Sequence, residues 1–262
     1  MKTINNPGSF SPYQFKSFRM IVSSLLSRIK SRDFSGALKF LRAELYNKWN
    51  KSKFFDTNGK YFCPLCGNNS GSFIRIGNNA NAVCPYCSSR ARHRGLLYYY
   101  KKEISNLAVE SKVLHFAPEP VFYSIFKNKS FIYQTTDYIL EDVDLPRQDV
   151  QNLSIADDTY DLVLSNHVIE HVPDDEKALA EMCRITKKGG KVIITVPGNY
   201  KKAATVYFSN LENNGHYRDY GMDFLIKMEK VFTKVEVLDL SSLDSNGELA
   251  IPRMELAFIG IK

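Results

Sequence analysis

The segment that decides the fold is DVQNLSIADDTYDLVLSNHVIEHVPDDEKALAEMCRITKKGGKVIITVPG, residues 149–198. Within it, YDLVLSN (residues 160–166) and KVIITVP (residues 191–197) are short apolar runs rich in β-branched residues, which predicts two buried strands. Between them, an acidic first turn and apolar positions at helical spacing predict a helix from Asp174 to Lys187, ended by two glycines. A helix of this length connects parallel strands.

Further short apolar runs flank this unit and alternate with helical patterns. Alternating strands and helices predict a Rossmann-like, doubly wound parallel α/β sheet. The last two runs leave no room for a crossover helix between them, so we expect them to pair antiparallel at one edge, the C-terminal strand being the edge strand. The four flanking runs are KVLHF (112–116), FIYQTTD (131–137), KVEVLDL (234–240) and MELAFIGIK (254–262).

Four of the five cysteines form two CPxC pairs with residues 67–83 between them. Two thiols separated by two residues reach one face of a tight turn, and two such turns complete a tetrahedral shell of thiolates that suits zinc. Because four cysteines close the shell, the spacing predicts a structural zinc ribbon and not a catalytic zinc. The predicted ligands are Cys63, Cys66, Cys84 and Cys87.

Basic residues follow the second pair directly, at Arg90, Arg92, His93 and Arg94. Their charge would offset the four thiolates or would bind an anionic group of a substrate, and both readings stay open. The remaining cysteine, Cys183, lies beside Met182 in the predicted helix and is expected to be a core residue.

The net charge of +7 lies mainly in residues 1–60, which hold 12 Lys and Arg against 3 Asp and Glu. Helical spacing of apolar residues predicts helices over residues 13–30 and 34–49. This basic extension would pack on the main domain or on a second copy of the chain, or would contact RNA or an anionic membrane surface. No apolar run reaches the length of a transmembrane helix and no secretory signal is found, so we expect a cytoplasmic protein. The predicted domains are residues 1–60, the zinc ribbon at 61–95 and the catalytic domain at 96–262.

The segment 149–198 resembles the class I S-adenosylmethionine (SAM)-dependent methyltransferases, in particular the group often called type 11, and the resemblance extends over about residues 110–262. It implies that Asp137 binds the ribose hydroxyls of SAM and that Asp149 and the Val150 backbone N–H lie by the adenine amino group. It also implies that Ser165 and Asn166 lie over the cofactor crevice.

The loop after the first strand, VLHFAPEPVF (residues 113–122), departs from the glycine-rich loop of these methyltransferases. Phe116 and Ala117 still fall at the cofactor-binding turn. His115 stands where the family has an acidic residue, and Glu119 would supply the missing carboxylate near the methionine ammonium. The chain also resembles zinc-ribbon methyltransferase-like proteins with a similar APEP loop, some from surface-polysaccharide gene clusters, and this resemblance is why a glycan is included among the acceptors.

Methyl transfer needs an acceptor nucleophile in line and in some cases a general base. The candidate bases are His171, in NHVIEHV (166–172), and His216, in GHYRDYG (215–221). Their neighbours His167, Glu170, Tyr217 and Tyr220 are further candidates, and a packing role for His171 stays open.

The sequence therefore predicts a SAM-dependent methyltransferase that acts on an oxygen or nitrogen of a small-molecule or glycan acceptor. Two alternatives remain at this point. One is an RNA methyltransferase, because zinc ribbons also precede some ribosomal RNA methyltransferases. The other is a binding module that kept the fold and lost SAM, for which the altered 113–122 loop is the reason.

Overall fold

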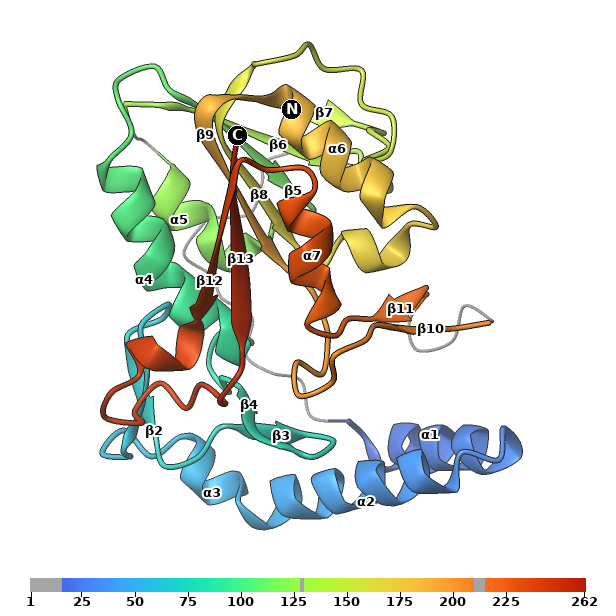
Figure 1. Cartoon of the computed structure of the whole chain (residues 1–262). Helices are drawn as coiled ribbons and strands as arrows, with labels where there is room; N and C mark the ends of the chain where they lie inside the picture. The colour runs from blue at the N-terminus through green and yellow to red at the C-terminus, as the bar shows by residue number, and fades with distance from the viewer. Residues whose placement is uncertain (1–15, 128–129, 210–214) are drawn as a thin grey trace. The chain divides into compact units, whose positions relative to one another are not determined.

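A computed structural model describes residues 16–127, 130–209 and 215–262, and Figure 1 shows its elements. The chain divides into two compact units. The first contains Met1–Lys101 and Ser241–Arg253, and the second contains Lys102–Leu240 and Met254–Lys262. In the described ranges, no helix combines the length and the apolar character needed to cross a membrane.

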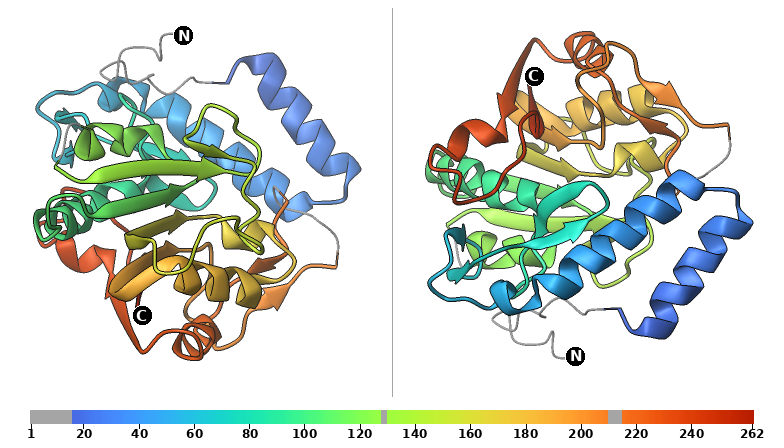
Figure 2. Two further views of the ribbon diagram at one scale, coloured as in Figure 1. Left: turned by 90° about the horizontal axis from the view of Figure 1, so that it is seen from above. Right: turned by 90° about the horizontal axis from the view of Figure 1, so that it is seen from below.

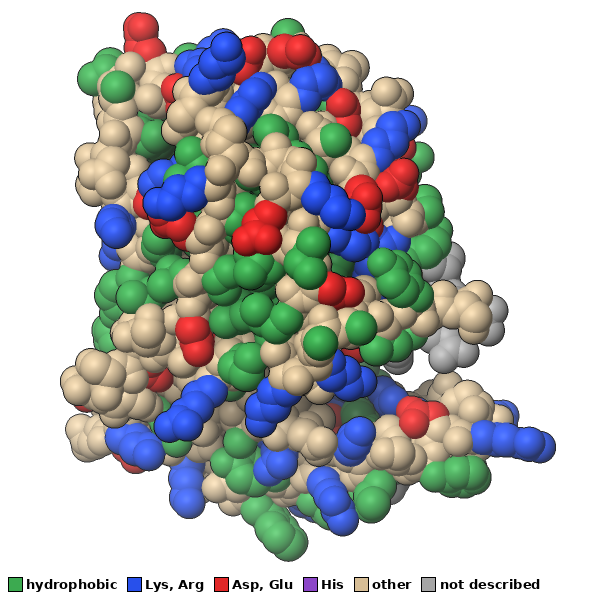
Figure 3. Space-filling model, viewed as in Figure 1, with side chains coloured by type: hydrophobic (Ala, Val, Ile, Leu, Met, Phe, Trp, Pro, Cys, Tyr) green, Lys and Arg blue, Asp and Glu red, His purple; other side chains and the backbone are tan. Residues whose placement is uncertain are grey.

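The first unit begins with two helices, α1 (Phe18–Lys30) and α2 (Phe34–Trp49), which lie side by side in the right-hand view of Figure 2. Each helix starts at a side-chain cap, since Ser17 accepts from the Met20 N–H and Asp33 accepts from the Gly36 N–H. The two predicted helices are therefore present, although residues 13–15 lie outside the described ranges. Lys and Arg side chains spread along these helices at the foot of Figure 3.

The cysteine module of the first unit consists of two antiparallel hairpins after the short helix α3 (Lys51–Phe54). The first hairpin pairs β1 (Tyr61–Cys63) with β2 (Asn68–Ser70), and the second pairs β3 (Ile74–Ile76) with β4 (Asn79–Val83). The long helix α4 (Ala91–Ser105) follows, and the residues after η3 (Leu240–Leu243) return to this unit.

The second unit is a seven-stranded sheet in the order β12-β13-β9-β8-β5-β6-β7. Every pairing is parallel except those of β13, which runs antiparallel to both β9 and β12. The predicted α/β fold is thus confirmed. The strands are β5 (Lys112–Phe116), β6 (Ile132–Asp137), β7 (Leu145–Pro146), β8 (Tyr160–Asn166), β9 (Thr186–Thr195), β12 (Lys234–Asp239) and β13 (Leu256–Ile261).

The C-terminal strand pairs antiparallel at one edge as expected, but β13 is not itself the outermost strand, since β12 takes that place. The reason is apolar character. The residues of β13 are buried over Leu256–Gly260, whereas every residue of β12 is exposed or half-buried. The more apolar strand gains more by insertion between two neighbours.

A second difference concerns the helix predicted from Asp174 to Lys187. Helix α6 covers Asp175–Ile185, and β9 already begins at Thr186. Tyr160 pairs with Thr186 while Leu162 pairs with Lys191, so the intervening residues bulge out of the ladder. Gly189 allows this bulge because its φ of 76° is a left-handed conformation that other residues adopt at a cost.

Helices cover both faces of this sheet (Figure 1). On one face lies α5 (Tyr123–Phe126), which follows η1 (Pro120–Phe122). On the other face lie α6 and α7 (Asp223–Glu229), and their buried side chains form the main core with Leu114, Val163 and Ile194. The remaining elements are η2 (Ile169–His171) and a two-stranded ribbon of β10 (Val206–Tyr207) and β11 (Arg218–Asp219).

The chain passes from β5 to β6 and β7 on one side of the sheet and then returns to β8 and β9 on the other. The strand order therefore reverses between β5 and β8. In open α/β sheets, ligands bind at such a switch point, outside the carboxyl ends of the strands. The residues that end β5 and β8 are thus the first place to look for a functional site.

Candidate functional site

The four predicted zinc ligands come together in the first unit. The Sγ atoms of Cys63 and Cys87 are 3.6 Å apart, and those of Cys66 and Cys84 are 3.8 Å apart. Four sulfurs at 2.3 Å from a tetrahedral zinc ion are about 3.8 Å apart, so the cluster has the dimensions of a tetrathiolate site. Hydrogen bonding with the Cys66 thiol lowers the pKa of Cys63, which favours a thiolate there. The clustering of the four thiols is consistent with the predicted zinc ribbon.

Arg94 is fully buried beside this cluster and binds backbone carbonyls. Its Nε donates to the Leu249 carbonyl at 2.5 Å and its Nη2 to the Asn81 carbonyl at 2.9 Å. Burial lowers the pKa of Arg94, and the negative charge of Cys63 opposes that shift. For Arg94, this supports the structural reading over anion binding, and it explains how residues 241–253 join the first unit.

At the switch point, the loop after β5 turns sharply at Ala117, whose φ of 45° lies in the left-handed region. The Ala117 N–H donates to the Thr136 carbonyl at 2.8 Å, which fixes this turn beside β6. A left-handed turn at the end of the first strand is where glycine is normally favoured. The altered sequence therefore keeps the turn with a small side chain in place of glycine, and Phe116 is buried just before it.

Glu119 and Asn166 meet over the same edge although they are distant in sequence. Asn166 Nδ2 donates to Glu119 Oε2 at 2.6 Å, and Thr195 Oγ1 donates to Asn166 Oδ1 at 3.0 Å. The side chain of His115 is fully buried beside them. Its Nε2 lies 3.7 Å from Glu119 Oε2, and its Nδ1 lies 2.9 Å from the Tyr133 hydroxyl. A carboxylate thus reaches the end of β5 from the loop, although His115 replaces the usual acidic residue on the strand.

Ser165, the residue before Asn166, is fully buried, and its Oγ has no hydrogen-bond partner among the described residues. Buried hydroxyl groups are normally paired, so an unpaired one near the end of β8 is consistent with a ligand or water partner. Ser165 precedes the last residue of β8, and its role at the cofactor stays a prediction.

Asp137, at the end of β6, and Asp149, in the loop after β7, each stabilise a turn by accepting hydrogen bonds from backbone N–H groups. Asp137 Oδ1 accepts from the N–H groups of Ile139 and Leu140 at 2.6 and 2.8 Å. Asp149 Oδ1 accepts from the Gln151 N–H at 2.9 Å, and Val150 beside it is buried. Both carboxylates are therefore held in place by local backbone groups.

The two candidate bases lie together in the second unit. The imidazole rings of His171 and His216 are 4.7 Å apart and nearly perpendicular. Burial lowers the pKa of His216 below its usual value, while the charge of Glu170 opposes that shift. Glu170 itself is fully buried, and His167 Nδ1 is 3.2 Å from its Oε1. The structure thus assembles three histidines around one carboxylate. Tyr217 follows His216 and contacts this group through its backbone N–H, which donates to the Glu170 carbonyl.

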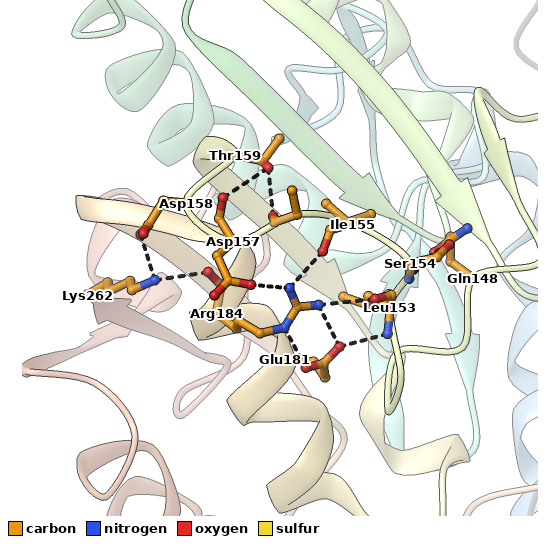
Figure 4. A network of polar contacts seen from close by, with 11 residues as sticks. Gln148, Leu153, Ser154, Ile155, Asp157, Asp158, Thr159, Glu181, Arg184 and Lys262 are labelled. Carbon is orange, nitrogen blue, oxygen red and sulfur yellow. Dashed lines mark hydrogen bonds and ion pairs between the residues drawn. The ribbon is translucent and has the colours of Figure 1, made fainter.

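Arg184 forms a network that the sequence did not indicate, shown in Figure 4. From the end of α6 its guanidinium donates to the carbonyls of Leu153 and Ile155 at 3.1 and 2.7 Å and to both oxygens of Glu181. Glu181 Oε2 in turn accepts from the Leu153 N–H at 2.7 Å. Hydrogen bonds to Glu181 raise the pKa of Arg184, so its guanidinium group stays protonated at any working pH. These bonds shape the loop that carries Asp149 and Val150.

We predict that Arg184→Gln weakens SAM binding about tenfold without contacting the cofactor, because the 149–155 loop loses its anchor. The check is calorimetric titration with SAM, with the folded state confirmed by circular dichroism. Arg147→Gln is the matched control, since Arg147 is an exposed arginine that pairs with the equally exposed Glu141. Equal affinities for the two variants would show that the network does not position the loop.

The strand order, the single antiparallel strand and the position of the switch point define the second unit as a class I methyltransferase fold. Residues 107–194 match the model of the family described as a methyltransferase domain.

Among curated proteins, a phosphatidylethanolamine N-methyltransferase of Cereibacter sphaeroides is 35% identical over 51 residues, which are 20% of this chain and 25% of that protein. A demethylmenaquinone methyltransferase of Halalkalibacterium halodurans is 42% identical over 57 residues, 22% of this chain and 23% of that protein. The chain thus spans about a quarter of the length of the curated relatives it matches.

Solved structures with a similar fold include the phosphoethanolamine N-methyltransferase 2 of Haemonchus contortus in complex with SAM. It has a TM-score of 0.47 and 14% identity, covering 71% of this chain and 54% of that one. Another is a SAM-dependent methyltransferase from Archaeoglobus fulgidus, with a TM-score of 0.45 and 13% identity, covering 64% of this chain and 94% of that one.

Proposed function

We propose that the chain is a SAM-dependent methyltransferase whose cofactor lies across the switch point of the sheet. The observation that carries the proposal is the meeting of the Ala117 turn, the Glu119–Asn166 pair and the unpaired Ser165 hydroxyl at the ends of β5 and β8. SAM, when bound, supplies an electrophilic methyl group to an acceptor nucleophile.

Along this edge of the sheet, we propose that successive residues contact successive parts of SAM. Glu119 would accept from the methionine ammonium, and Asp137 would accept from the two ribose hydroxyls. Asp149 would accept from the adenine amino group, with the Val150 N–H as donor to a ring nitrogen. Tyr138, Ile139 and Leu140, which follow Asp137, are 68%, 83% and 52% exposed and offer apolar surface to the adenosine.

For the acceptor we propose an oxygen or nitrogen of a small-molecule or glycan substrate. The curated relatives bear the names of methyltransferases for phosphatidylethanolamine and demethylmenaquinone, which supports a small-molecule acceptor over RNA. His171 and His216 would act as general bases, because the burial that lowers the pKa of His216 keeps its imidazole neutral and able to accept a proton. We also propose zinc as the ion of the four-cysteine cluster, with a structural role.

We expect the full chain to bind SAM in calorimetric titration and Asp137→Ala to bind at least about tenfold more weakly, since a hydrogen bond to a charged group contributes about 1.5–3 kcal/mol. Asp142→Ala is the matched control, because Asp142 is an exposed carboxylate in the same loop. Binding that the control keeps and Asp137→Ala loses would support the cofactor site. No binding by the folded chain would overturn the methyltransferase proposal and leave the binding-module reading.

The RNA alternative is tested with the same protein, because residues 16–60 carry exposed basic side chains. A fluorescent RNA should bind with an affinity that falls steeply with salt if phosphate contacts dominate. Weak or salt-insensitive binding would exclude the RNA reading, whereas tight, salt-dependent binding would replace the small-molecule acceptor by RNA.

A further inference from the structure

A second cluster with metal-binding chemistry lies in the second unit, apart from the cysteines. Three of the five histidines of the chain gather at one carboxylate there. Glu170, His171 and His216 each offer one ligand atom, and these atoms lie within 4.8 Å of one another. Glu170 and His171 come from η2, directly after β8, while His216 comes from the segment before β11.

The orientation of His171 favours a metal ligand over a simple ion pair. Its Nδ1 lies 3.3 Å from the Gly215 carbonyl, which selects the tautomer protonated at Nδ1. Nε2 then carries the lone pair, and this nitrogen lies 3.9 Å from Glu170 Oε1. Histidines that bind metals almost always donate their other ring N–H to a carbonyl or carboxylate in this way.

The carboxylate is held from its other side. His167 Nδ1 lies 3.2 Å from Glu170 Oε1, so a proton on this nitrogen can orient the carboxylate toward the remaining two rings. His167 adopts a positive φ of 53°, a conformation that costs a non-glycine residue energy and that places the ring beside Glu170. Glu170 is fully buried, and a buried carboxylate needs nearby positive charge to offset its desolvation.

We propose that Glu170, His171 and His216 bind a divalent transition metal ion. Two imidazoles and one carboxylate are a donor set that suits Zn²⁺ and Co²⁺. Ligand atoms of a tetrahedral ion lie about 3.3 Å apart, so the 3.9 Å between His171 Nε2 and Glu170 Oε1 closes with a small rotation of either side chain. Three protein ligands leave a coordination position open, and the His171 side chain is 43% exposed, so solvent or a substrate oxygen can reach the ion. This proposal does not depend on SAM binding, and with the ion bound His171 and His216 serve as its ligands and not as general bases.

The test counts metal ions in the full chain. The protein is stripped with a chelator, re-equilibrated with buffered Zn²⁺ and analysed for zinc per chain. We expect two ions for the wild type and one for either His171→Gln or His216→Gln. Tyr217→Phe is the matched control, since it alters the neighbour of a ligand and leaves the three ligands in place, and it should keep two.

Cobalt distinguishes the two sites by spectroscopy. Co²⁺ in the cysteine cluster gives an intense sulfur-to-metal charge-transfer absorption, whereas Co²⁺ bound by nitrogen and oxygen gives only weak visible bands. His216→Gln should remove the weak bands and keep the intense absorption. Cys84→Ser should remove the intense absorption and keep the weak bands. One ion in the wild type, or two in both histidine variants, would overturn the proposal and leave a histidine–carboxylate cluster without metal. SAM titration of the same samples reports separately on the proposed function.

Discussion

Replacing Asp175 with alanine is expected to lower the free energy of unfolding of the methyltransferase domain by about 3–5 kcal/mol, because removing one partner of a buried ion pair leaves an uncompensated charge. The Asp175 side chain, 5% exposed, lies 3.1 Å from Arg218 Nη1 and 2.8 Å from Lys227 Nζ. Tyr220 also donates to it at 3.0 Å. The carboxylate thus joins α6, β11 and α7 at one point.

The two cations remain charged in this buried place because of that carboxylate. Burial lowers the pKa of Lys227, but the hydrogen bonds to Asp175 and Tyr207, together with the charges of these two groups, outweigh this effect and raise the pKa above its usual value. Arg218, 1% exposed, also donates to the carbonyls of Val172 and Pro173 at 2.8 and 2.6 Å. Alanine at position 175 would therefore leave a buried guanidinium that cannot lose its proton.

The measurement is urea unfolding of the full chain followed by far-ultraviolet circular dichroism. Glu176→Ala is the matched control, since its side chain is 56% exposed and lies 3.7 Å from the same Lys227 Nζ. Exposed pairs contribute at most about 1 kcal/mol, so the control should unfold close to the wild type. If Asp175→Ala were no less stable than this control, the network would not stabilise the domain.

Removing the cysteine ligands should have an equally large effect in the first unit. We expect Cys84→Ser to lose the zinc of the cysteine cluster and to unfold residues 61–90, because structural zinc supplies about 10–16 kcal/mol in isolated zinc-finger peptides. The hairpins are short, and among the buried residues of the core around the cysteines Phe73 is the one that is not a cysteine. So small a core does not fold without the metal.

Zinc content and limited proteolysis check this expectation, with new cleavage between residues 61 and 90 as the sign of unfolding. Cys183→Ser is the matched control, since Cys183 lies in the second unit and donates to the Val231 carbonyl at 3.5 Å. The control should keep its zinc and resist cleavage. Retention of zinc by Cys84→Ser at wild-type affinity would mean that Cys84 is not a ligand.

Much of the fold could be predicted from the sequence because its signals are local. Alternating apolar runs and helical patterns are read over a few residues, and they predicted each long strand of the sheet. The element ends were less accurate. The helix over residues 174–187 ends two residues early because pairing of Thr186 with Tyr160, distant in sequence, outweighs local helix propensity.

The candidate sites also contain residues that local sequence signals predicted and residues that only the structure reveals. The CPxC spacing predicted four ligands whose sulfurs the structure brings together. The roles of Glu119, Asp137, Asp149 and the two histidines remain predictions, although the structure places each at the carboxyl edge of the sheet or beside it. Arg184 and Arg218 had no sequence signal, since an arginine in a polar segment is normally exposed to solvent.

By itself, the sequence determined the α/β class, the zinc-ribbon spacing and the methyltransferase resemblance, because each depends on residues close together in the chain. Only the tertiary structure decided that residues 241–253 belong with the first unit, that Asn166 binds Glu119, and that His216 meets Glu170. Such contacts join segments far apart in sequence, and they form only when burial of the apolar strands fixes the order of the sheet.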